Sequence, residues 1–297
     1  MKILVSGSSG LVGSALVLRL EGEGHEVWKL VRAKPQAEGS VFWDPQTGQF
    51  DREQMEGFDA LVHLAGENIA AHRWTHAQKN RLFLSRCRDT WLLSQALTRL
   101  KQPPHTLITA SACGFYGDRG LEPLTEESPK GNGFLADLCG RWEQSTATAE
   151  ESGIRVVHAR FGIGLSPKGG ALQKMLTPFR LGLGGRLGSG LQIMPWVAVE
   201  DMVGAISHLL QKQDIRGAVN ICSPHSVPQK EFAKLLAEKL HRPAFFHIPA
   251  AVLRLLLGEM ANELLLTSAN VEPKRLLKSG YVFRYPDLKG YFDSLII

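Results

Sequence analysis

Residues 2–13 of the chain read Lys-Ile-Leu-Val-Ser-Gly-Ser-Ser-Gly-Leu-Val-Gly. The aliphatic run at the start predicts a buried strand, and the apolar spacing beyond it predicts a helix. Gly7, Gly10 and Gly13 therefore lie on the turn between the two. In such a turn the first glycine allows a sharp bend, the second lets a pyrophosphate approach the backbone, and the third lets helix and strand pack closely. This context favours a dinucleotide-binding site over a purely structural turn.

The N-terminus of the predicted helix adds a second feature to this turn. Its first N–H groups, at Leu11, Val12 and Gly13, have no partner within the helix and carry a partial positive charge. They are therefore expected to bind the pyrophosphate of the dinucleotide.

Beyond the turn, short β-branched runs alternate with longer helical patterns, which is typical of a parallel sheet with crossover helices. The predicted fold is α/β: a Rossmann-type doubly wound parallel sheet with a smaller, mainly helical C-terminal cap. Residues 1–165 and 196–222 are expected to form the Rossmann domain, and residues 166–195 and 223–297 the substrate and cap region. Strands are expected at 2–6, 26–31, 41–43, 60–64, 106–110, 155–159, 197–199 and 218–221, and helices at 11–23, 77–100, 135–151 and 201–211.

The end of the second predicted strand indicates which dinucleotide is bound. Enzymes that use NAD usually carry an acidic residue there, which holds the 2′-hydroxyl of the ribose. Here the sequence is Leu30-Val31-Arg32-Ala33-Lys34, without an acid. Arg32, helped by Lys34, suits a 2′-phosphate, although a pair of solvated surface cations is the alternative. We therefore expect NADP(H) as the cofactor.

Composition excludes several other classes of protein. The 297 residues are 44% hydrophobic, as in ordinary globular proteins, and the net charge of +5 is scattered, which argues against nucleic-acid binding. None of the four cysteines forms a C-x-x-C pair, so neither a disulfide framework nor a metal site is expected. The apolar stretch from Ala250 to Leu257 contains Arg254 and is too short to cross a bilayer. We expect a cytoplasmic protein that binds no membrane.

Several motifs resemble the extended short-chain dehydrogenase/reductase family. Ser6 and the glycines match its T-G-x-x-G-x-x-G turn, with Ser in place of Thr. Residues 59–66 resemble its fourth-strand motif, whose end at Leu64, Ala65 and Gly66 would back the adenosine side. Ser111-Ala-Cys-Gly-Phe-Tyr-Gly117 is similar to its S-S-x-x-x-Y-G signature, and Val197-Ala-Val-Glu-Asp201 to its H-V-x-D element.

The resemblance is closest to a subgroup called epimerase family proteins, of the 39U type. This resemblance implies a fold like that of nucleotide-sugar epimerases and NADP(H) as cofactor, with an undefined substrate. The matching stretches are Ala65-Gly-Glu-Asn-Ile69 with Arg73-Trp-Thr75, Arg141-Trp-Glu143, Pro178-Phe-Arg-Leu-Gly-Leu-Gly-Gly185 with Gly188-Ser-Gly190, and Pro273-Lys-Arg275.

The catalytic pattern of the family is incomplete in this chain. The family uses a Tyr-x-x-x-Lys pair on the helix after the fifth strand, in which lysine and cofactor charge lower the pKa of the tyrosine. Counting back eight residues from Glu143 places Leu135 and Cys139 at these two positions, and no Tyr-x-x-x-Lys occurs elsewhere. The expected serine position holds Ala112. The candidate catalytic residues are therefore its neighbour Ser111, which would need a bulged strand end, and Tyr116, for which a positional role is the alternative.

Two further residues are candidates for cofactor binding. Arg86 matches the asparagine of the family's N-V-x-G-T helix, and an arginine there would contact the cofactor phosphates or an anionic substrate. An exposed arginine on a surface helix is the alternative. Arg160-Phe-Gly-Ile163 resembles the segment whose backbone borders the nicotinamide carboxamide, which implicates Ile163. His63 is interpreted as a core histidine rather than a metal ligand.

These features support an NADP(H)-dependent oxidoreductase or epimerase-like enzyme. An NADP(H)-binding regulator that has lost catalysis is the alternative, favoured by the missing pair. The expected partner is a small-molecule substrate, an anionic one if the glycine-rich loop from Arg180 to Arg186 closes over it. That loop equally suits a connector between domains, and either a monomer or a homodimer is compatible with the sequence.

Overall fold

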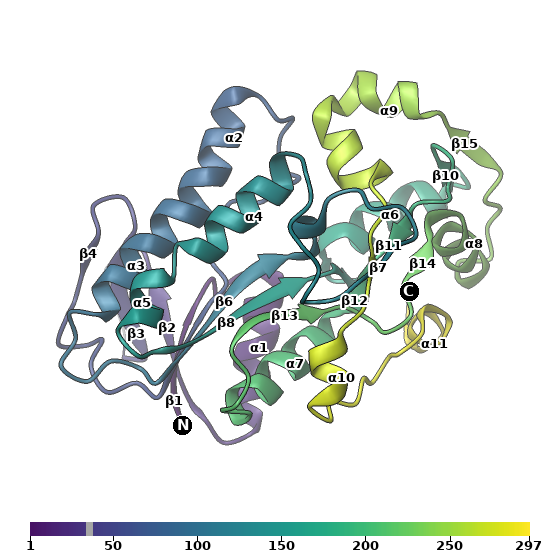
Figure 1. The fold of residues 1–297 in the computed structure, drawn as a ribbon. Helices are drawn as coiled ribbons and strands as arrows, with labels where there is room; N and C mark the ends of the chain where they lie inside the picture. Colours follow the sequence, from purple (N-terminus) through teal and green to yellow (C-terminus); the bar gives the residue numbers. More distant parts are fainter. Residues whose placement is uncertain (34–37) are drawn as a thin grey trace. The chain divides into compact units, whose positions relative to one another are not determined.

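The computed structural model describes residues 1–33 and 38–297 (Figure 1). Lys34 lies outside the described residues. The contacts divide the chain into two compact units. The first comprises Met1–Ser111, Leu138–Ala159 and Val203–Val219, and the second comprises Ala112–Asp137, Arg160–Met202 and Asn220–Ile297. The domain boundaries expected from the sequence remain a prediction.

The central sheet has the strand order β13-β8-β6-β5-β1-β2-β3-β4. Neighbouring pairs from β3 through β2, β1 and β5 to β6 are parallel, and the short β4 is antiparallel to its neighbour β3. β1 therefore lies between β2 and β5, where the strand order reverses, and ligands of such sheets bind at that point. The strands are β1 (Lys2–Ser6), β2 (Glu26–Val31), β3 (Ser40–Asp44), β4 (Gln49–Phe50), β5 (Ala60–His63), β6 (Thr106–Ala112), β8 (Arg155–Phe161) and β13 (Gly217–Ile221).

Helices lie on both sides of this sheet, so the predicted doubly wound architecture is confirmed. In Figure 1, α4 and α5 lie on one side of β6 and β8, and α1 and α7 lie on the other. Trp142 on α4 donates to Thr90 on α3, and Ser207 on α7 donates to Glu23 at the end of α1. The helices are α1 (Leu11–Gly22), α2 (His76–Phe83), α3 (Asp89–Leu97), α4 (Phe134–Gln144), α5 (Ala147–Glu151) and α7 (Val199–Gln211).

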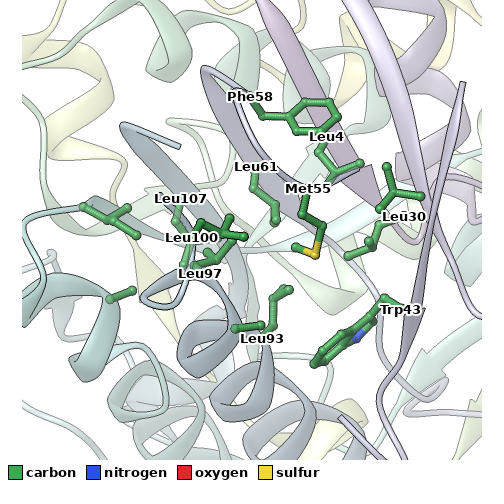
Figure 2. Close-up of a cluster of buried hydrophobic side chains, with 14 of the residues drawn as sticks. Leu4, Leu30, Trp43, Met55, Phe58, Leu61, Leu93, Leu97, Leu100 and Leu107 are labelled. Carbon is green, nitrogen blue, oxygen red and sulfur yellow. The ribbon is translucent and has the colours of Figure 1, made fainter. Parts of the chain in front are cut away.

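A hydrophobic core joins the sheet to α3 (Figure 2). Leu4, Leu61 and Leu107 come from the adjacent strands β1, β5 and β6, and each is at most 1% exposed. Leu93 and Leu97 lie four residues apart on α3, on the face that meets these strands. Burial of each leucine contributes about 1.5–3 kcal/mol to folding. This core holds the carboxyl ends of β1 and β5 in place.

Two predicted helices are interrupted in the structure. The helix expected over 77–100 contains a π-helical segment, η1 (Leu84–Arg88), between α2 and α3. A π turn accommodates an extra residue, which rotates the following side chains by about 100°. The helix expected over 135–151 is divided into α4 and α5. There Ser145 Oγ donates to Arg141 O and Thr146 Oγ1 to Glu143 O, so these hydroxyls compete with the helical pattern.

The second unit contains helices and short strand pairs. Its helix α6 was not predicted, because glycines precede it and Pro178 lies inside it. The glycine-rich segment expected as a loop contains β10, which pairs with β15. The elements are η2 (Cys113–Tyr116), β7 (Pro123–Leu124), β9 (Ile163–Ser166), α6 (Gly170–Arg180), β10 (Gly185–Leu187), β11 (Ile193–Met194), β12 (Trp196–Ala198), β14 (Val227–Pro228), α8 (Gln229–Lys239), β15 (Phe246–Ile248), α9 (Ala250–Leu257), η3 (Ala261–Leu266), β16 (Asn270–Val271), α10 (Lys274–Lys278) and α11 (Leu288–Ser294).

Within residues 1–33 and 38–297, no helix combines the length and the hydropathy needed to cross a membrane. The same residues contain no cluster of three or more His, Cys, Asp or Glu side chains arranged to hold a metal ion.

Candidate functional site

The glycine turn after β1 leaves no room for side chains. Gly7 has a φ of +68°, which favours glycine. A Cβ placed on Gly13 would lie 2.1 Å from Gly7 O, closer than any real contact. The backbone at Gly7 also lies against the next segment, since a Cβ there would be 2.8 Å from Ala65 N. The turn is therefore a closely packed backbone cradle, as a pyrophosphate site requires.

The N-terminus of α1 follows this cradle directly. Its N-cap is Gly10, which provides no side-chain cap, and the N–H of Gly10 itself donates to Gly7 O at 3.0 Å. The first N–H groups of the helix, at Leu11, Val12 and Gly13, have no acceptor within the helix. Together with the helix dipole, they form a site suited to a phosphate.

Ser6 connects the glycine turn to the end of β5. Its Oγ accepts hydrogen bonds from Leu64 N at 3.1 Å and Ala65 N at 3.3 Å, and it lies 2.7 Å from His63 Nδ1. With both N–H groups donating to the hydroxyl, the hydroxyl proton is free to be donated to Nδ1. Burial lowers the pKa of His63 to about 4, so the ring is neutral at pH 7. His63 thus helps to order the segment against which Gly7 packs.

Arg32 follows β2 directly and is exposed. Asp89 lies in the first turn of α3, and burial raises the pKa of its carboxyl above the ordinary value. A hydrogen bond from Arg88 Nη2 at 2.8 Å and the nearby charge of Arg32 lower this pKa but do not outweigh burial. The structure therefore adds Arg88 and Asp89 to the surroundings of Arg32. The sequence gives no local signal for this, because the residues belong to separate elements.

Arg86 lies in η1 and is partly buried rather than exposed. A Cβ placed on Gly66 would be 3.7 Å from its Cζ, and the guanidinium lies 5.2 Å from the ring centroid of Trp142. Burial lowers the pKa of Arg86. Across the described part of the chain, no carboxylate lies within 4.0 Å of it, and its one hydrogen bond, to Ser85 Oγ, is 3.5 Å long. The predicted cofactor residues Gly66 and Arg86 are thus brought together.

Ser111 is buried near the end of β6 and donates to Glu143 Oε1 at 2.7 Å. Glu143 lies on α4, the helix that also carries Leu135 and Cys139. These three positions are four residues apart and therefore share one face of the helix. Leu135 and Cys139 are both buried. The Ser111–Glu143 hydrogen bond was not foreseen, although both residues lie within motifs that the sequence singles out.

Tyr116 and Ile163 belong to the second unit. Tyr116 is fully buried; its hydroxyl donates to Asn220 Oδ1 at 2.7 Å and accepts from Arg160 Nη1 at 2.9 Å. Desolvation raises the pKa of Tyr116 well above its ordinary value. These contacts favour the positional role that sequence analysis left open. Ile163 begins β9, and its N–H donates to Pro195 O at 2.6 Å.

The comparison with known proteins agrees with this geometry. Residues 3–222 match the model of the NAD dependent epimerase/dehydratase family. The chain belongs to this family. Residues 248–295 of this epimerase-family protein match a second model, a domain of unknown function called DUF1731.

The relatives of this family member cover nearly all of its length. It is 40% identical to an epimerase family protein of Mycobacterium tuberculosis (strain CDC 1551 / Oshkosh), over 95% of this chain and 93% of that protein. It is 36% identical to the human epimerase family protein SDR39U1 over the whole of both chains. The crystal structure of human SDR39U1 (isoform 2) with NADPH superposes with a TM-score of 0.89, 35% identity and coverage of 99% and 100% of the two chains.

A second solved structure is a nucleoside-diphosphate sugar epimerase from Corynebacterium glutamicum. It has a TM-score of 0.82 and 35% identity, and the match covers 98% of this chain and 57% of that one. These findings confirm the family resemblance and the Rossmann-type fold predicted from the motifs.

Proposed function

We propose that the protein binds NADP(H) and acts as an oxidoreductase or epimerase on a small molecule. The observation that carries this proposal is the cradle at the end of β1, in which a Cβ on Gly13 would lie 2.1 Å from Gly7 O. The cradle opens onto an uncapped helix N-terminus, so its donors are available to a pyrophosphate. The NADPH in the crystal structure of human SDR39U1 supports the same cofactor.

In this proposal each part of the cofactor has its own residues. NADP(H), when bound, supplies or accepts a hydride at its nicotinamide ring. The donors of α1 hold the pyrophosphate, Arg32 binds the 2′-phosphate, and Leu64 and Ala65, which lie against Gly7, back the adenosine side. The proposed cofactor residues are Gly7, Gly10, Leu11, Val12, Gly13, Arg32, Leu64, Ala65, Gly66, Arg86 and Ile163.

Ser111 is the proposed residue for contact with the reacting oxygen of the substrate. Its hydroxyl donates to Glu143, so its lone pairs remain able to accept a hydrogen bond from a substrate hydroxyl. Tyr116 is proposed to have a positional role within the second unit, through Arg160 and Asn220. The substrate class to test first is a nucleoside-diphosphate sugar, because the Corynebacterium glutamicum neighbour carries that name.

The second candidate function is an NADP(H)-binding regulator without catalysis. It is favoured by the buried, non-titrating Leu135 and by Cys139 at the positions where the family resemblance expects a tyrosine and a lysine. The raised pKa of Tyr116 and its two hydrogen bonds make this tyrosine a poor substitute.

Calorimetric titration with NADPH and NADH tests the cofactor. We expect tighter binding of NADPH, and Arg32→Glu should reverse the order by repelling the 2′-phosphate. Lys29→Glu is the matched control, since Lys29 is an exposed cation on β2, the strand that Arg32 follows, and the change in charge is equal. Equal affinity for the two dinucleotides would exclude the proposed role of Arg32.

Oxidation of NADPH in the presence of carbonyl compounds, and conversion of nucleoside-diphosphate sugars, test for catalysis. An active enzyme should lose at least about tenfold in kcat when Ser111 is replaced by alanine. Unchanged turnover in Ser111→Ala would remove Ser111 from the site. If a broad panel gives no turnover while NADPH binds, the regulator is the better description.

A further inference from the structure

The surroundings of Arg86 link it to the helix that carries Cys139. Its guanidinium lies 5.2 Å from the ring centroid of Trp142 on α4. Cys139 precedes Trp142 by three residues, so the two share one face of that helix. Helical side chains point back towards the N-terminus, which brings the Trp142 ring over the turn of Cys139. Burial lowers the pKa of Arg86, and the Cys139 thiol is among the neighbouring groups that offset part of this lowering.

Arg86 is also a cation without a matching anion in the described residues. The Trp142 face offsets part of the cost of its burial, and the Glu67 carboxyl acts on it from beyond ion-pair distance. Most of its five N–H donors have no acceptor in the part of the chain that the structure describes. A partly desolvated guanidinium in this state favours a ligand with oxygen acceptors.

The strand order indicates which half of a dinucleotide this ligand is. β2, which ends at Arg32, lies on one side of β1, and β5, which leads to Gly66 and Arg86, lies on the other. In doubly wound sheets the two nucleotide halves lie on opposite sides of this point. Leu64 and Ala65 lie against Gly7 at the turn itself, whereas Gly66 lies beside Arg86. Arg86 therefore belongs to the half that Arg32 does not serve.

We propose that Arg86 supplies, from the neighbouring helix, the positive charge that Cys139 cannot supply, and that it binds oxygen atoms of the nicotinamide half of NADP(H). The inference rests on the proposed function and assigns a specific role to this one residue. The charge is thus retained in the site, but it is carried by η1 instead of α4. Arg86 lies in the π turn of η1, and its guanidinium lies beside Gly66, where a Cβ would be in ordinary van der Waals contact with it at 3.7 Å.

Two ligands distinguish contacts with the two halves of the cofactor when their affinities are compared. NADPH contains both nucleotides, whereas adenosine 2′,5′-bisphosphate contains only the adenosine half. We expect Arg86→Met to weaken NADPH binding by about tenfold to a hundredfold, the usual effect of losing a charged hydrogen bond. Affinity for the bisphosphate should stay within about twofold, since that half makes no such bond. Arg81→Met, which removes an exposed cation from α2, is the control and should change neither affinity.

A charge exchange between the two helices provides the second measurement. In Arg86→Met, the further change Cys139→Lys should restore much of the lost NADPH affinity, and Arg86→Lys alone should retain most of it. Thermal unfolding identifies any variant that fails to fold. If the double variant does not fold, the difference in NADPH affinity between Arg86→Lys and Arg86→Met decides. The proposal would be overturned if Arg86→Met lost affinity for NADPH and for the bisphosphate equally, or lost no affinity for NADPH. Failure of the wild-type protein to bind NADPH would instead refute the proposed function itself.

Discussion

Ser6 Oγ lies 2.7 Å from His63 Nδ1, and this contact connects the first strand of the sheet to the segment that follows its neighbour. The same oxygen accepts from Leu64 N and Ala65 N, against which Gly7 packs. The shape of the glycine turn therefore depends on a histidine more than fifty residues away in the sequence.

The buried His63 should make stability depend on pH. Its pKa is about 4 in the folded protein against 6.5 ordinarily. Between these values the unfolded chain binds the proton and the folded chain does not. The free energy of unfolding should therefore fall by roughly 3 kcal/mol as pH decreases from 6.5 to 4, and be unaffected by this group above pH 6.5. Urea unfolding across this range measures it.

His63→Asn should flatten this pH dependence, because the amide oxygen can still accept from Ser6 and does not titrate. The exposed His72→Asn serves as control and should retain the slope of the wild type. An unaltered slope in His63→Asn would mean that other groups cause the acid sensitivity.

Gly13→Ala should damage both the turn and cofactor binding. The new methyl group would meet Gly7 O at 2.1 Å, and backbone on both sides has to move. Overpacking of this kind costs about 1–3 kcal/mol. Thermal unfolding and NADPH titration measure the two effects. Gly22→Ala, in the last turn of the same helix, has no atom within 4 Å of the new methyl group and should be neutral or slightly stabilising. Similar losses in both variants would contradict this explanation.

Tyr116→Phe should lower stability, because Asn220 loses a buried donor and Arg160 loses an acceptor. Such a loss typically costs about 1–3 kcal/mol. Tyr285→Phe is the control, since the Tyr285 hydroxyl makes no hydrogen bond to the residues that the structure describes. If Tyr116→Phe keeps full stability but abolishes turnover, Tyr116 is a catalytic residue and the positional role is wrong.

Asp201 should hold the C-terminal segment in place. Its carboxylate accepts from Tyr281 Oη at 3.1 Å, Arg284 N at 2.7 Å and Tyr285 N at 2.9 Å. Asp201→Asn weakens these bonds and should cost about 1–3 kcal/mol. Limited proteolysis should then cleave near residue 281 earlier than in the wild type. Asp293→Asn, which removes only an exposed partner of Lys289, should leave the cleavage rate unchanged; faster cleavage there too would argue against a specific role of Asp201.

Local patterns were sufficient for the frame of the protein. The glycine spacing at 7, 10 and 13 and the alternation of β-branched and helical runs determined the Rossmann-type sheet and the dinucleotide cradle, because both depend on residues close together in the chain. The family motifs determined the membership that the comparisons confirm. The proposed role of Arg32 in binding the 2′-phosphate followed from its position directly after β2.

The tertiary structure decided everything that depends on contacts between distant segments. Periodicity does not reveal the π turn at Arg86, because apolar residues continue on both sides of it. The hydrogen bonds of Ser6 with His63 and of Ser111 with Glu143 join separate elements, so no local pattern shows them. The sequence alone determined that an arginine stands at position 86. Only the packing of η1 against Gly66 and Trp142 decided that this arginine is a partly buried cation beside an aromatic ring.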